Sequence, residues 1–237
     1  IDNGYYENNI ISNSEIKNIN QIYKDVRNIE EEDLRDINTI VHLAAISNDP
    51  MGEEFKDATL DINLHASIRL ANLAAKSGVS NFVFASSCSV YGDGGTEAKK
   101  EEDALNPLTS YAISKVEFEN ELNLLTKKSN MIATALRFST ACGVSPRLRL
   151  DLVLNDFVVS ALTLKKIKIL SDGSPLRPII DVRDMSRAIH WAINRNSDKL
   201  NKFISVNVGR EDNNMNIASI ANVVKECLPE TEIELND

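Results

Sequence analysis

Short runs rich in β-branched and aromatic residues alternate with longer stretches of helical periodicity along most of this 237-residue chain. Such alternation is typical of βαβ units, whose parallel strands are buried between helices. Residues apolar enough for buried strands occupy 39–45, 81–85, 131–138, 166–170 and 203–208. Helical periodicity marks 53–76, 110–127, 152–164, 184–194 and 217–227. The sequence therefore predicts an α/β protein with a parallel sheet, in which Gly78 ends the first long helix.

Charge and cysteine content exclude several classes of protein. The net charge of −9 argues against a general binder of nucleic acid or anionic membranes, because these attract basic surfaces. No apolar run approaches the roughly twenty residues that a membrane helix needs, so we expect no membrane partner. Cys88, Cys142 and Cys227 are an odd number at wide spacing, which predicts reduced thiols in a cytoplasm rather than a disulfide framework. The three histidines lack ligand spacing, so we expect no metal site.

The two ends of the chain differ in character from its middle. From about Gly143 onward, the sequence is richer in proline and in short elements, which suggests a smaller lobe packed beside the sheet. The opening stretch, 3–20, is polar and rich in asparagine. We expect a surface loop with a short helix there.

Ser87, Tyr111 and Lys115 carry the strongest chemical signal. Ser87 stands where the predicted strand 81–85 ends, in the run FVFASSCSVYG, and the other two lie four residues apart on the next predicted helix. That spacing puts both side chains on one helix face. An unperturbed tyrosine has a pKa of about 10, and a neighbouring ammonium favours its phenolate. We therefore expect Tyr111 to act as a base tuned by Lys115, with Ser87 holding the reacting oxygen.

Several further stretches accompany this group of three residues: VHLAA at 41–45, Asn63 in the following helix, and LRFSTACG at 136–143. Together with FVFASSCSVYG they make the chain resemble the extended short-chain dehydrogenase/reductases. Within these it resembles the NAD-dependent epimerase/dehydratase family, which includes UDP-galactose 4-epimerase. The resemblance covers nearly the whole chain, and it implies that Ser87, Tyr111 and Lys115 are catalytic.

The resemblance implies a fold as well as a cofactor. The family has a Rossmann-type doubly wound parallel sheet with a small C-terminal substrate-binding lobe. We therefore expect an NAD-binding domain over 1–143 and a mainly substrate-binding lobe over 144–237, with some of its segments returning to the sheet. No glycine-rich fingerprint is present. Because the strand and turn that carry it would precede Ile1, we expect the first βα unit, about thirty residues, to be missing and NAD binding by this exact chain to be weak.

The NAD site implied by the resemblance begins at the second residue. Asp2 resembles the acidic residue that binds the adenosine ribose diol and repels a 2′-phosphate, which favours NAD over NADP. A simple turn over Asp2 and Asn3 is the alternative interpretation. Asp25 and Val26 resemble the pair that contacts adenine, with a surface turn as the alternative. The remaining cofactor positions that the resemblance implies are Leu43, Ala44, Ala45, Asn63, Ala85, Tyr111, Lys115 and Ser139.

The resemblance also implies a site for a nucleotide-diphosphate sugar. Arg177 resembles an arginine that grips the diphosphate, and a bidentate contact of this kind suits a net-acidic protein. Asn155 and Thr140 resemble positions near the diphosphate and sugar, although the family often has asparagine where Thr140 stands. Ser87 and Cys88 complete the predicted substrate contacts.

The residues from Ser87 to Tyr91 limit the reactions that the resemblance allows. Sugar 4,6-dehydratases have an Asp and a Glu where Cys88 and Ser89 stand, so dehydration is disfavoured. Enzymes that epimerise at C3 and C5, including GDP-fucose synthases, place a cysteine at the position of Ser89. The three catalytic residues suffice for reversible oxidation at C4, which predicts a 4-epimerase. The alternatives are a 4-ketosugar reductase, a 3,5-epimerase/reductase, and a non-catalytic nucleotide-binding relative or inert fragment.

The resemblance extends to assembly. The long helices predicted over 53–76 and 110–127 resemble those that pair across a twofold axis in relatives, giving a four-helix interface. We therefore expect a homodimer of the whole protein.

Overall fold

The computed structural model describes residues 1–10, 20–47, 49–93, 95, 97–196 and 201–235. The chain divides into two compact units. The first comprises Ile1–Tyr5, Asn20–Phe138 and Ser186–Val208. The second comprises Tyr6–Ile19, Ser139–Met185 and Gly209–Asp237, of which 11–19 and 236–237 lie outside the described residues.

The first unit is built on a parallel sheet whose described strands follow the order β1-β2-β3-β7. The strands are β1 (Thr39–His42), β2 (Asn81–Ser87), β3 (Ile132–Phe138) and β7 (Phe203–Val208). Every pairing among them is parallel. β2 and β3 are buried along almost their whole length, as the apolar runs predicted. The expected strand 39–45 is shorter than predicted, because the chain leaves the sheet after His42.

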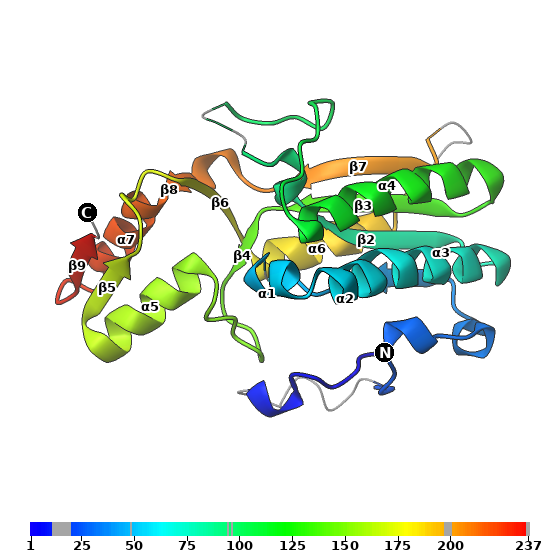
Figure 1. The fold of residues 1–237 in the computed structure, drawn as a ribbon, viewed down its shortest axis with the longest axis horizontal. Helices are drawn as coiled ribbons and strands as arrows, with labels where there is room; N and C mark the ends of the chain where they lie inside the picture. Colours follow the sequence, from blue (N-terminus) through cyan, green and yellow to red (C-terminus); the bar gives the residue numbers. More distant parts are fainter. Residues whose placement is uncertain (11–19, 48, 94, 96, 197–200, 236–237) are drawn as a thin grey trace. The chain divides into compact units, whose positions relative to one another are not determined.

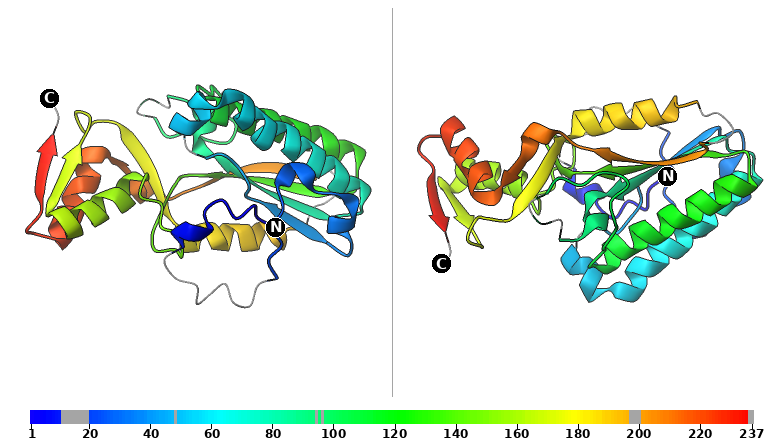
Figure 2. Two further views of the ribbon diagram at one scale, coloured as in Figure 1. Left: turned by 60° about the horizontal axis from the view of Figure 1, so that its bottom comes forward. Right: turned by 90° about the horizontal axis from the view of Figure 1, so that it is seen from above.

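Helices cover both faces of this sheet (Figures 1 and 2). α3 (Ala66–Lys76) and α4 (Ser110–Lys128) lie on one face, and α6 (Val182–Ile193) on the other. The fully buried rings of Phe82, Phe84 and Phe118 fill the space between the sheet and α4. Helices on both faces of a parallel sheet confirm the predicted Rossmann-type doubly wound fold.

The predicted helix 53–76 is not continuous. It consists of α1 (Asp49–Glu54), α2 (Lys56–Leu60), a π-helical turn η5 (Asp61–His65) and α3. Gly78 ends it as predicted: its φ is +80°, and the amides of Ser77 and Val79 donate to carbonyls of the last turn. A π turn inserts one residue into the helical repeat, and such turns occur frequently at functional sites.

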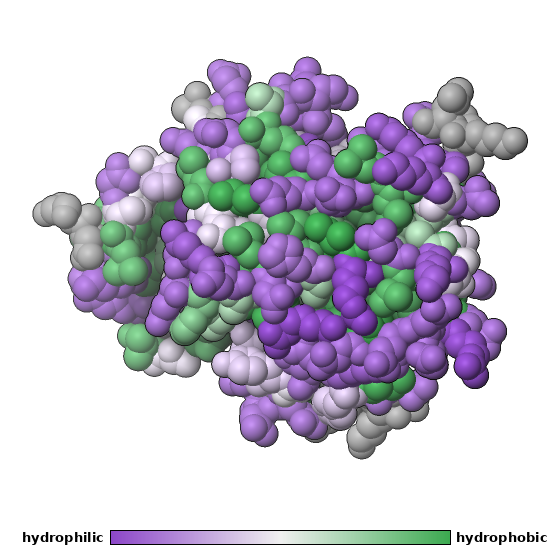
Figure 3. All heavy atoms as spheres, turned by 45° about the vertical axis from the view of Figure 1, so that its right-hand side comes forward, coloured by the Kyte–Doolittle hydropathy of each residue, from purple (hydrophilic) through white to green (hydrophobic). Residues whose placement is uncertain are grey.

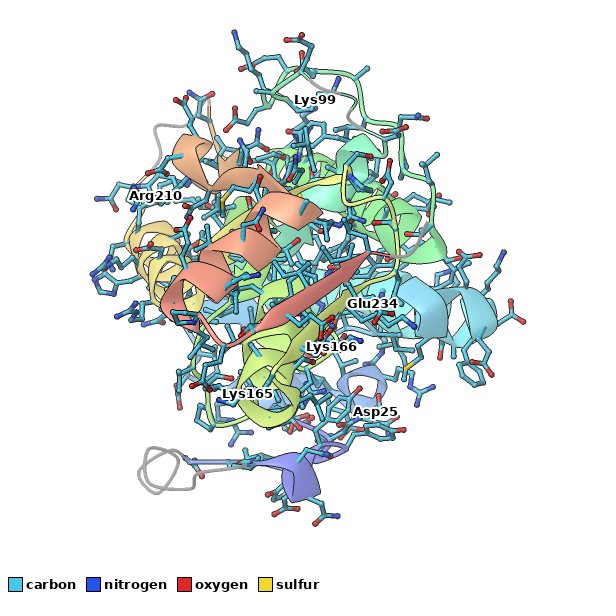
Figure 4. All side chains as sticks on the ribbon, turned by 90° about the vertical axis from the view of Figure 1, so that its left-hand side faces the viewer. Asp25, Lys99, Lys165, Lys166, Arg210 and Glu234 are labelled. Carbon is cyan, nitrogen blue, oxygen red and sulfur yellow. The ribbon has the colours of Figure 1, made fainter. Side chains whose placement is uncertain are left out.

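The described residues of the second unit form two small sheets and include the helices α5 (Val153–Leu164) and α7 (Ile217–Cys227). The strands of one sheet are, in order, β4 (Thr140–Cys142), β6 (Leu176–Asp181) and β8 (Asn214–Asn216). In the other sheet, β5 (Lys166–Ile169) pairs in parallel with β9 (Glu232–Leu235). α5 and α7 pack on a core that includes Phe157, Ile167 and Ile220. The predicted strand 166–170 is therefore present as β5, but its partner is β9 rather than a strand of the main sheet. Lys166 and Glu234 form an ion pair across these two strands (Figure 4).

Short 3₁₀ turns occur at η1 (Glu7–Asn9), η3 (Val26–Asn28), η4 (Glu31–Leu34), η6 (Cys88–Tyr91) and η7 (Glu211–Asn213). Of the predicted opening loop with a short helix, η1 is the helix, and 11–19 lie outside the described residues. Among the helices described, none is both long and apolar enough to span a membrane.

Candidate functional site

Ser87 is the last residue of β2 and the N-cap of η6. Its Oγ accepts hydrogen bonds from the backbone amide of Ser89 (3.2 Å) and from the Ser89 hydroxyl (3.0 Å). Serine is a favoured cap residue because its oxygen satisfies an amide that the first turn leaves unpaired. The hydroxyl is only partly buried. The sequence thus fixes Ser87 at the carboxyl end of the sheet, where open α/β sheets bind ligands.

Tyr111 and Lys115 lie on the first two turns of α4. Thr109 caps this helix by accepting a hydrogen bond from Ala112. The Lys115 ammonium donates to the carbonyl of Ala85 in β2 (2.8 Å) and lies 5.2 Å from the centre of the Tyr111 ring. The structure therefore brings the predicted tyrosine–lysine pair together, beside the strand that ends in Ser87.

Burial controls the charge of Lys115. Only 3% of the residue is exposed, and its ammonium lies 4.6 Å from the centre of the Phe84 ring. Burial lowers the pKa of Lys115 to about 7, while the nearby carboxylate of Glu119 opposes that shift. An amine with a pKa in this range can change its charge near neutral pH, which suits it to tune a neighbouring phenol.

The loop after β1 presents an open stretch of backbone at the same end of the sheet. Leu43 is 58% exposed, Ala44 is exposed and Ala45 is half-buried. The buried side chain of Asn63, in the π turn η5, holds the next residue: it accepts from the amide of Ile46 (2.8 Å) and donates to its carbonyl (2.9 Å). The described hydrogen bonds of the Asn63 side chain are thus with the loop itself, and its predicted contact with a cofactor stays a prediction.

A buried histidine is linked to Asn63 through the hydroxyl of Ser67. The His42 ring is packed among Phe82, Phe84 and Phe118, and its Nε2 lies 2.7 Å from the hydroxyl of Ser67. That hydroxyl in turn donates to the backbone carbonyl of Asn63 (2.8 Å). Burial first, and the charge of Lys115 second, lower the pKa of His42 to about 3. His42 is therefore a neutral, buried residue at physiological pH.

We expect His42 to make the protein less stable in acid. An unfolded histidine titrates near pH 6.5, so between that value and pH 3 the unfolded chain binds more protons than the folded one. The stability that neutral His42 contributes is complete above about pH 6.5 and falls as the pH drops, by about 2 kcal/mol at pH 5. Urea unfolding at pH 7 and pH 5 should show a smaller difference in His42→Gln than in wild type. The exposed His65→Gln is the control, and an undiminished difference in His42→Gln would contradict the prediction.

The predicted adenosine residues lie on two paired segments of the first unit. Asp2 bridges Tyr23 in parallel, through backbone hydrogen bonds to Ile22 and Lys24. The Asp2 carboxylate is exposed and accepts from the amide of Gly4 (2.7 Å), so the expected turn is also present. Asp25 forms an ion pair with Arg27 (2.8 Å), which lowers the pKa of its carboxyl group. Their binding roles stay predictions.

Neighbouring residues Asn3 and Val26 complete this part of the predicted site. Asn3 is exposed, and its side chain accepts from the amide of Tyr5 (3.0 Å). Val26 is partly buried and packs against the core of the first unit, so it anchors the 3₁₀ turn η3.

In the second unit, Asn155 is buried and ties two loop segments together. Its side chain accepts from the amide of Gly143 (3.2 Å) and donates to the carbonyl of Arg149 (2.9 Å). Thr140 opens β4 and is half-buried. Ser139 precedes it, so close to Gly209 that a Cβ at the glycine would come within 2.4 Å of the serine hydroxyl.

The predicted diphosphate arginine lies in the same unit. Arg177 is an exposed residue of β6, and its guanidinium donates to the carbonyl of Leu176 (3.0 Å). Arg147 stacks over the ring of Tyr6, with its guanidinium carbon 3.3 Å from the ring centre. Arg149 pairs with Asp151. Of these arginines, Arg149 is thus paired with a carboxylate, whereas the described hydrogen bond of Arg177 is to a backbone carbonyl.

Two buried charged residues were not singled out from the sequence. Glu119 on α4 and Arg137 on β3 form an ion pair with 2.7 Å between Nη2 and Oε2, and both side chains are at most 6% exposed. A charged residue inside the apolar run LRF was the available signal. The described residues contain no cluster of three or more His, Cys, Asp or Glu that could hold a metal ion.

Comparisons with known proteins place this geometry in a family. The family model described as the NAD dependent epimerase/dehydratase family matches residues 2–209. A putative UDP-glucose 4-epimerase of Methanocaldococcus jannaschii is 27% identical over 207 residues, which are 86% of this chain and 66% of the relative. The chain thus spans slightly less than two thirds of that protein.

Solved structures give the same result for the fold. MoeE5 in complex with UDP-glucose and NAD is 25% identical with a TM-score of 0.80, over 91% of this chain and 71% of that one. TunA, described as an NAD-dependent NDP-hexosamine 5,6-dehydratase, is 24% identical with a TM-score of 0.80, over 91% of this chain and 69% of that one. Because the family model matches residues 2–209, the chain belongs to the NAD-dependent epimerase/dehydratase family.

Proposed function

We propose that the protein is an NAD-dependent 4-epimerase of a nucleotide-diphosphate hexose. The observation that supports this most is the contact of Lys115 with both the Tyr111 ring and the Ala85 carbonyl, on the strand that ends in Ser87. A base, a cation that tunes it and a hydroxyl are the groups needed to oxidise a secondary alcohol and to reduce it again.

The described residues fit NAD. The exposed backbone from Leu43 to Ala45 follows a parallel strand at its carboxyl end, where α/β sheets bind nucleotides, and the exposed carboxylate of Asp2 suits a ribose diol. We assign adenosine to Asp2, Asn3, Asp25 and Val26. The loop after β1 would approach the rest of the cofactor, together with the other predicted cofactor positions, Asn63, Ala85, Tyr111, Lys115 and Ser139. When bound, NAD accepts the hydrogen that leaves the sugar carbon.

The protein's own residues handle the proton. In the proposed reaction, the Tyr111 phenolate removes the proton of the sugar 4-hydroxyl, and the Ser87 hydroxyl donates to the same oxygen. The Lys115 ammonium stabilises the phenolate. Because burial lowers the pKa of Lys115 to about 7, the charge of this ammonium depends on its surroundings. In the return step the hydride goes back to C4 on the opposite face of the sugar, and Tyr111 gives the proton back to the oxygen, so that C4 is inverted.

The first two residues of η6 favour inversion over elimination. Elimination of water needs a general acid and a general base beside Ser87, but the next two residues are Cys88 and Ser89, and the Ser89 hydroxyl donates to Ser87. We assign the sugar nucleotide to Ser87, Cys88, Thr140, Asn155 and Arg177. The second candidate is a 4-ketosugar reductase, since the same three residues also suffice for one-way reduction.

The test is a product assay by NMR. The protein with bound NAD is incubated with UDP-, dTDP-, GDP- and CDP-hexoses, with and without added NADH. Inversion at C4 without added NADH supports the 4-epimerase, and its absence for every sugar contradicts it. Consumption of NADH with a 4-keto sugar supports the reductase instead. Saturable binding of a sugar nucleotide without turnover indicates a binding protein.

We also propose that the whole protein is a homodimer formed through α3 and α4. Exposed apolar side chains, including Ile113 and Leu124 of α4, are available for an interface. On the side of the molecule that Figure 3 shows, such apolar side chains are interspersed with hydrophilic ones. Light scattering after size-exclusion chromatography should give twice the monomer mass, and Leu124→Glu should shift it toward the monomer. A wild-type protein that elutes only as a monomer would refute the dimer.

A further inference from the structure

Glu119 is a buried carboxylate one helical turn beyond Lys115. It is 3% exposed. Its described hydrogen bonds all come from donors on neighbouring strands. Arg137 of β3 donates to both of its oxygens, Ser86 of β2 donates to Oε1 (2.5 Å), and Ser205 of β7 donates to Oε2 (3.0 Å). This carboxylate therefore joins α4 to three adjacent strands of the main sheet.

Arg137 extends the same network to the segment that leads into α4. Its Nη1 donates to the hydroxyl of Tyr91 (2.9 Å) and to the backbone carbonyl of Glu101 (3.2 Å). The Tyr91 hydroxyl donates to the side-chain oxygen of Asn207 in β7 (2.7 Å). The backbone amide of Asn207 in turn donates to the carboxylate of Glu101 (2.8 Å). One guanidinium thus fixes η6, which follows Ser87, and the chain that approaches Tyr111.

Stability alone does not account for this pair. Removing two charges from water is costly, and apolar side chains of similar size often stabilise a core equally well. The position on the helix is informative instead. Residues 111, 115 and 119 are four apart, so their side chains share one face of α4. Glu119 therefore lies on the side of the helix that carries the proposed base and its lysine.

We propose that Glu119 and Arg137 form a positioning pair for Tyr111 and Lys115. The Glu119 charge favours the protonated form of Lys115. The Arg137 hydrogen bonds hold α4 and the segment at Glu101 in register with β2 and β3. The inference rests on the proposed function of Tyr111 and Lys115. It assigns to the pair a role in setting the charge of the base.

The groups around Lys115 identify Glu119 as the relevant charge. His42 faces it from β1 and is neutral, because burial lowers the pKa of that ring to about 3. β2 presents the Phe84 ring and the carbonyl of Ala85, and α4 presents the Tyr111 ring and Glu119. Among these described neighbours, Glu119 is the one that opposes the loss of the ammonium.

The test follows the ionisation of Tyr111 directly. Protein labelled with ¹³C at the tyrosine ζ carbon is titrated by NMR, and the Tyr111 signal is identified by its loss in Tyr111→Phe. In Glu119→Gln the ammonium of Lys115 loses its attraction and faces an unpaired Arg137, so we expect the Tyr111 pKa to rise by about one unit. Glu119→Gln combined with Arg137→Met removes both charges, and in this double variant we expect the Tyr111 pKa to rise by less than in Glu119→Gln alone.

Arg195→Gln is the matched control. This half-buried arginine also joins segments, because it donates to Ala133 and Thr134 of β3 and to Lys202, but none of its described contacts is with Glu119 or Arg137. Its loss should lower the melting temperature and leave the Tyr111 pKa unchanged. An unchanged Tyr111 pKa in both the Glu119→Gln and the double variant overturns the proposal.

The titration needs no turnover, so it separates this inference from the proposed function. A shifted Tyr111 pKa in a protein that converts no sugar supports the positioning pair and refutes only the proposed reaction. Where turnover is present, we expect kcat of Glu119→Gln to fall at neutral pH with little change in KM, and the pH profile of kcat to move in the direction of the Tyr111 pKa. Recovery of kcat at higher pH is a result that a merely structural role would not produce.

Discussion

Replacing Tyr111 by phenylalanine is expected to lower kcat for inversion at C4 by roughly 10²–10⁴-fold, the usual contribution of a positioned acid or base. Phenylalanine keeps the ring that Lys115 contacts at 5.2 Å and removes only the hydroxyl that exchanges the proton. We expect KM for the sugar nucleotide and the melting temperature to stay close to wild type. Steady-state kinetics with the sugar that the NMR panel identifies gives the measurement.

Tyr5→Phe is the control for this loss, because Tyr5 is 72% exposed and has no assigned part in the reaction. It should keep the wild-type kcat. A Tyr111→Phe enzyme that retains most of its kcat would show that another group moves the proton. In that case the Tyr111 and Lys115 contact would be structural only.

Replacing Arg137 by methionine is expected to reduce the free energy of unfolding by about 3–5 kcal/mol. The methionine leaves Glu119 as a buried carboxylate without its cation, and it also removes the donor to Tyr91 and to the carbonyl of Glu101. Glu119→Gln combined with Arg137→Met should recover a large part of this loss, since no uncompensated charge remains. Urea unfolding of wild type, both single variants and the double variant gives the coupling between the two side chains.

The sign of the coupling is the decisive quantity for this prediction. If the two single losses simply add in the double variant, the charges do not compensate each other, and the ion pair is energetically irrelevant. A loss below about 1 kcal/mol for Arg137→Met alone would likewise contradict the prediction, because it would lie within the range of a surface ion pair.

Periodicity was sufficient to predict the main elements of the first unit. The apolar runs that became β2, β3 and β7 are long enough to be recognised, and α4 was correct to within one residue at its C-terminal end. The π turn η5 was not predictable in the same way. A single inserted residue barely alters the apolar pattern, and what holds that turn is the contact of Asn63 with Ile46, which joins residues seventeen positions apart.

The second unit shows where sequence patterns fail. β4 and β8 have three residues each and are only partly buried, so they lack the length that alternation needs to be visible. Asp181 was assigned no role from the sequence. In the structure its carboxylate caps α6 by accepting from the amide of Arg183 (2.8 Å), a role for which aspartate is favoured.

The candidate catalytic residues could be proposed from the sequence, but the buried residues that pack beside them could not. Ser87, Tyr111 and Lys115 follow from spacing and context, because their roles require those residue types. Glu119 looks like an ordinary surface charge in the linear sequence, and Arg137 stands out only as a charged residue inside the apolar run LRF. Only the packing of α4 on β3 makes them a buried pair, and nothing local in the sequence specifies that contact.

The most direct test of reversible oxidation at C4 is the fate of the hydrogen on that carbon. A hexose nucleotide deuterated at C4 is incubated with the protein and NAD in ordinary water, and the inverted product is examined by NMR. The proposed mechanism predicts that deuterium is retained at C4, because that hydrogen leaves and returns without passing through solvent, whereas only the hydroxyl proton goes through Tyr111. An inverted product that has lost its deuterium to water would contradict the mechanism.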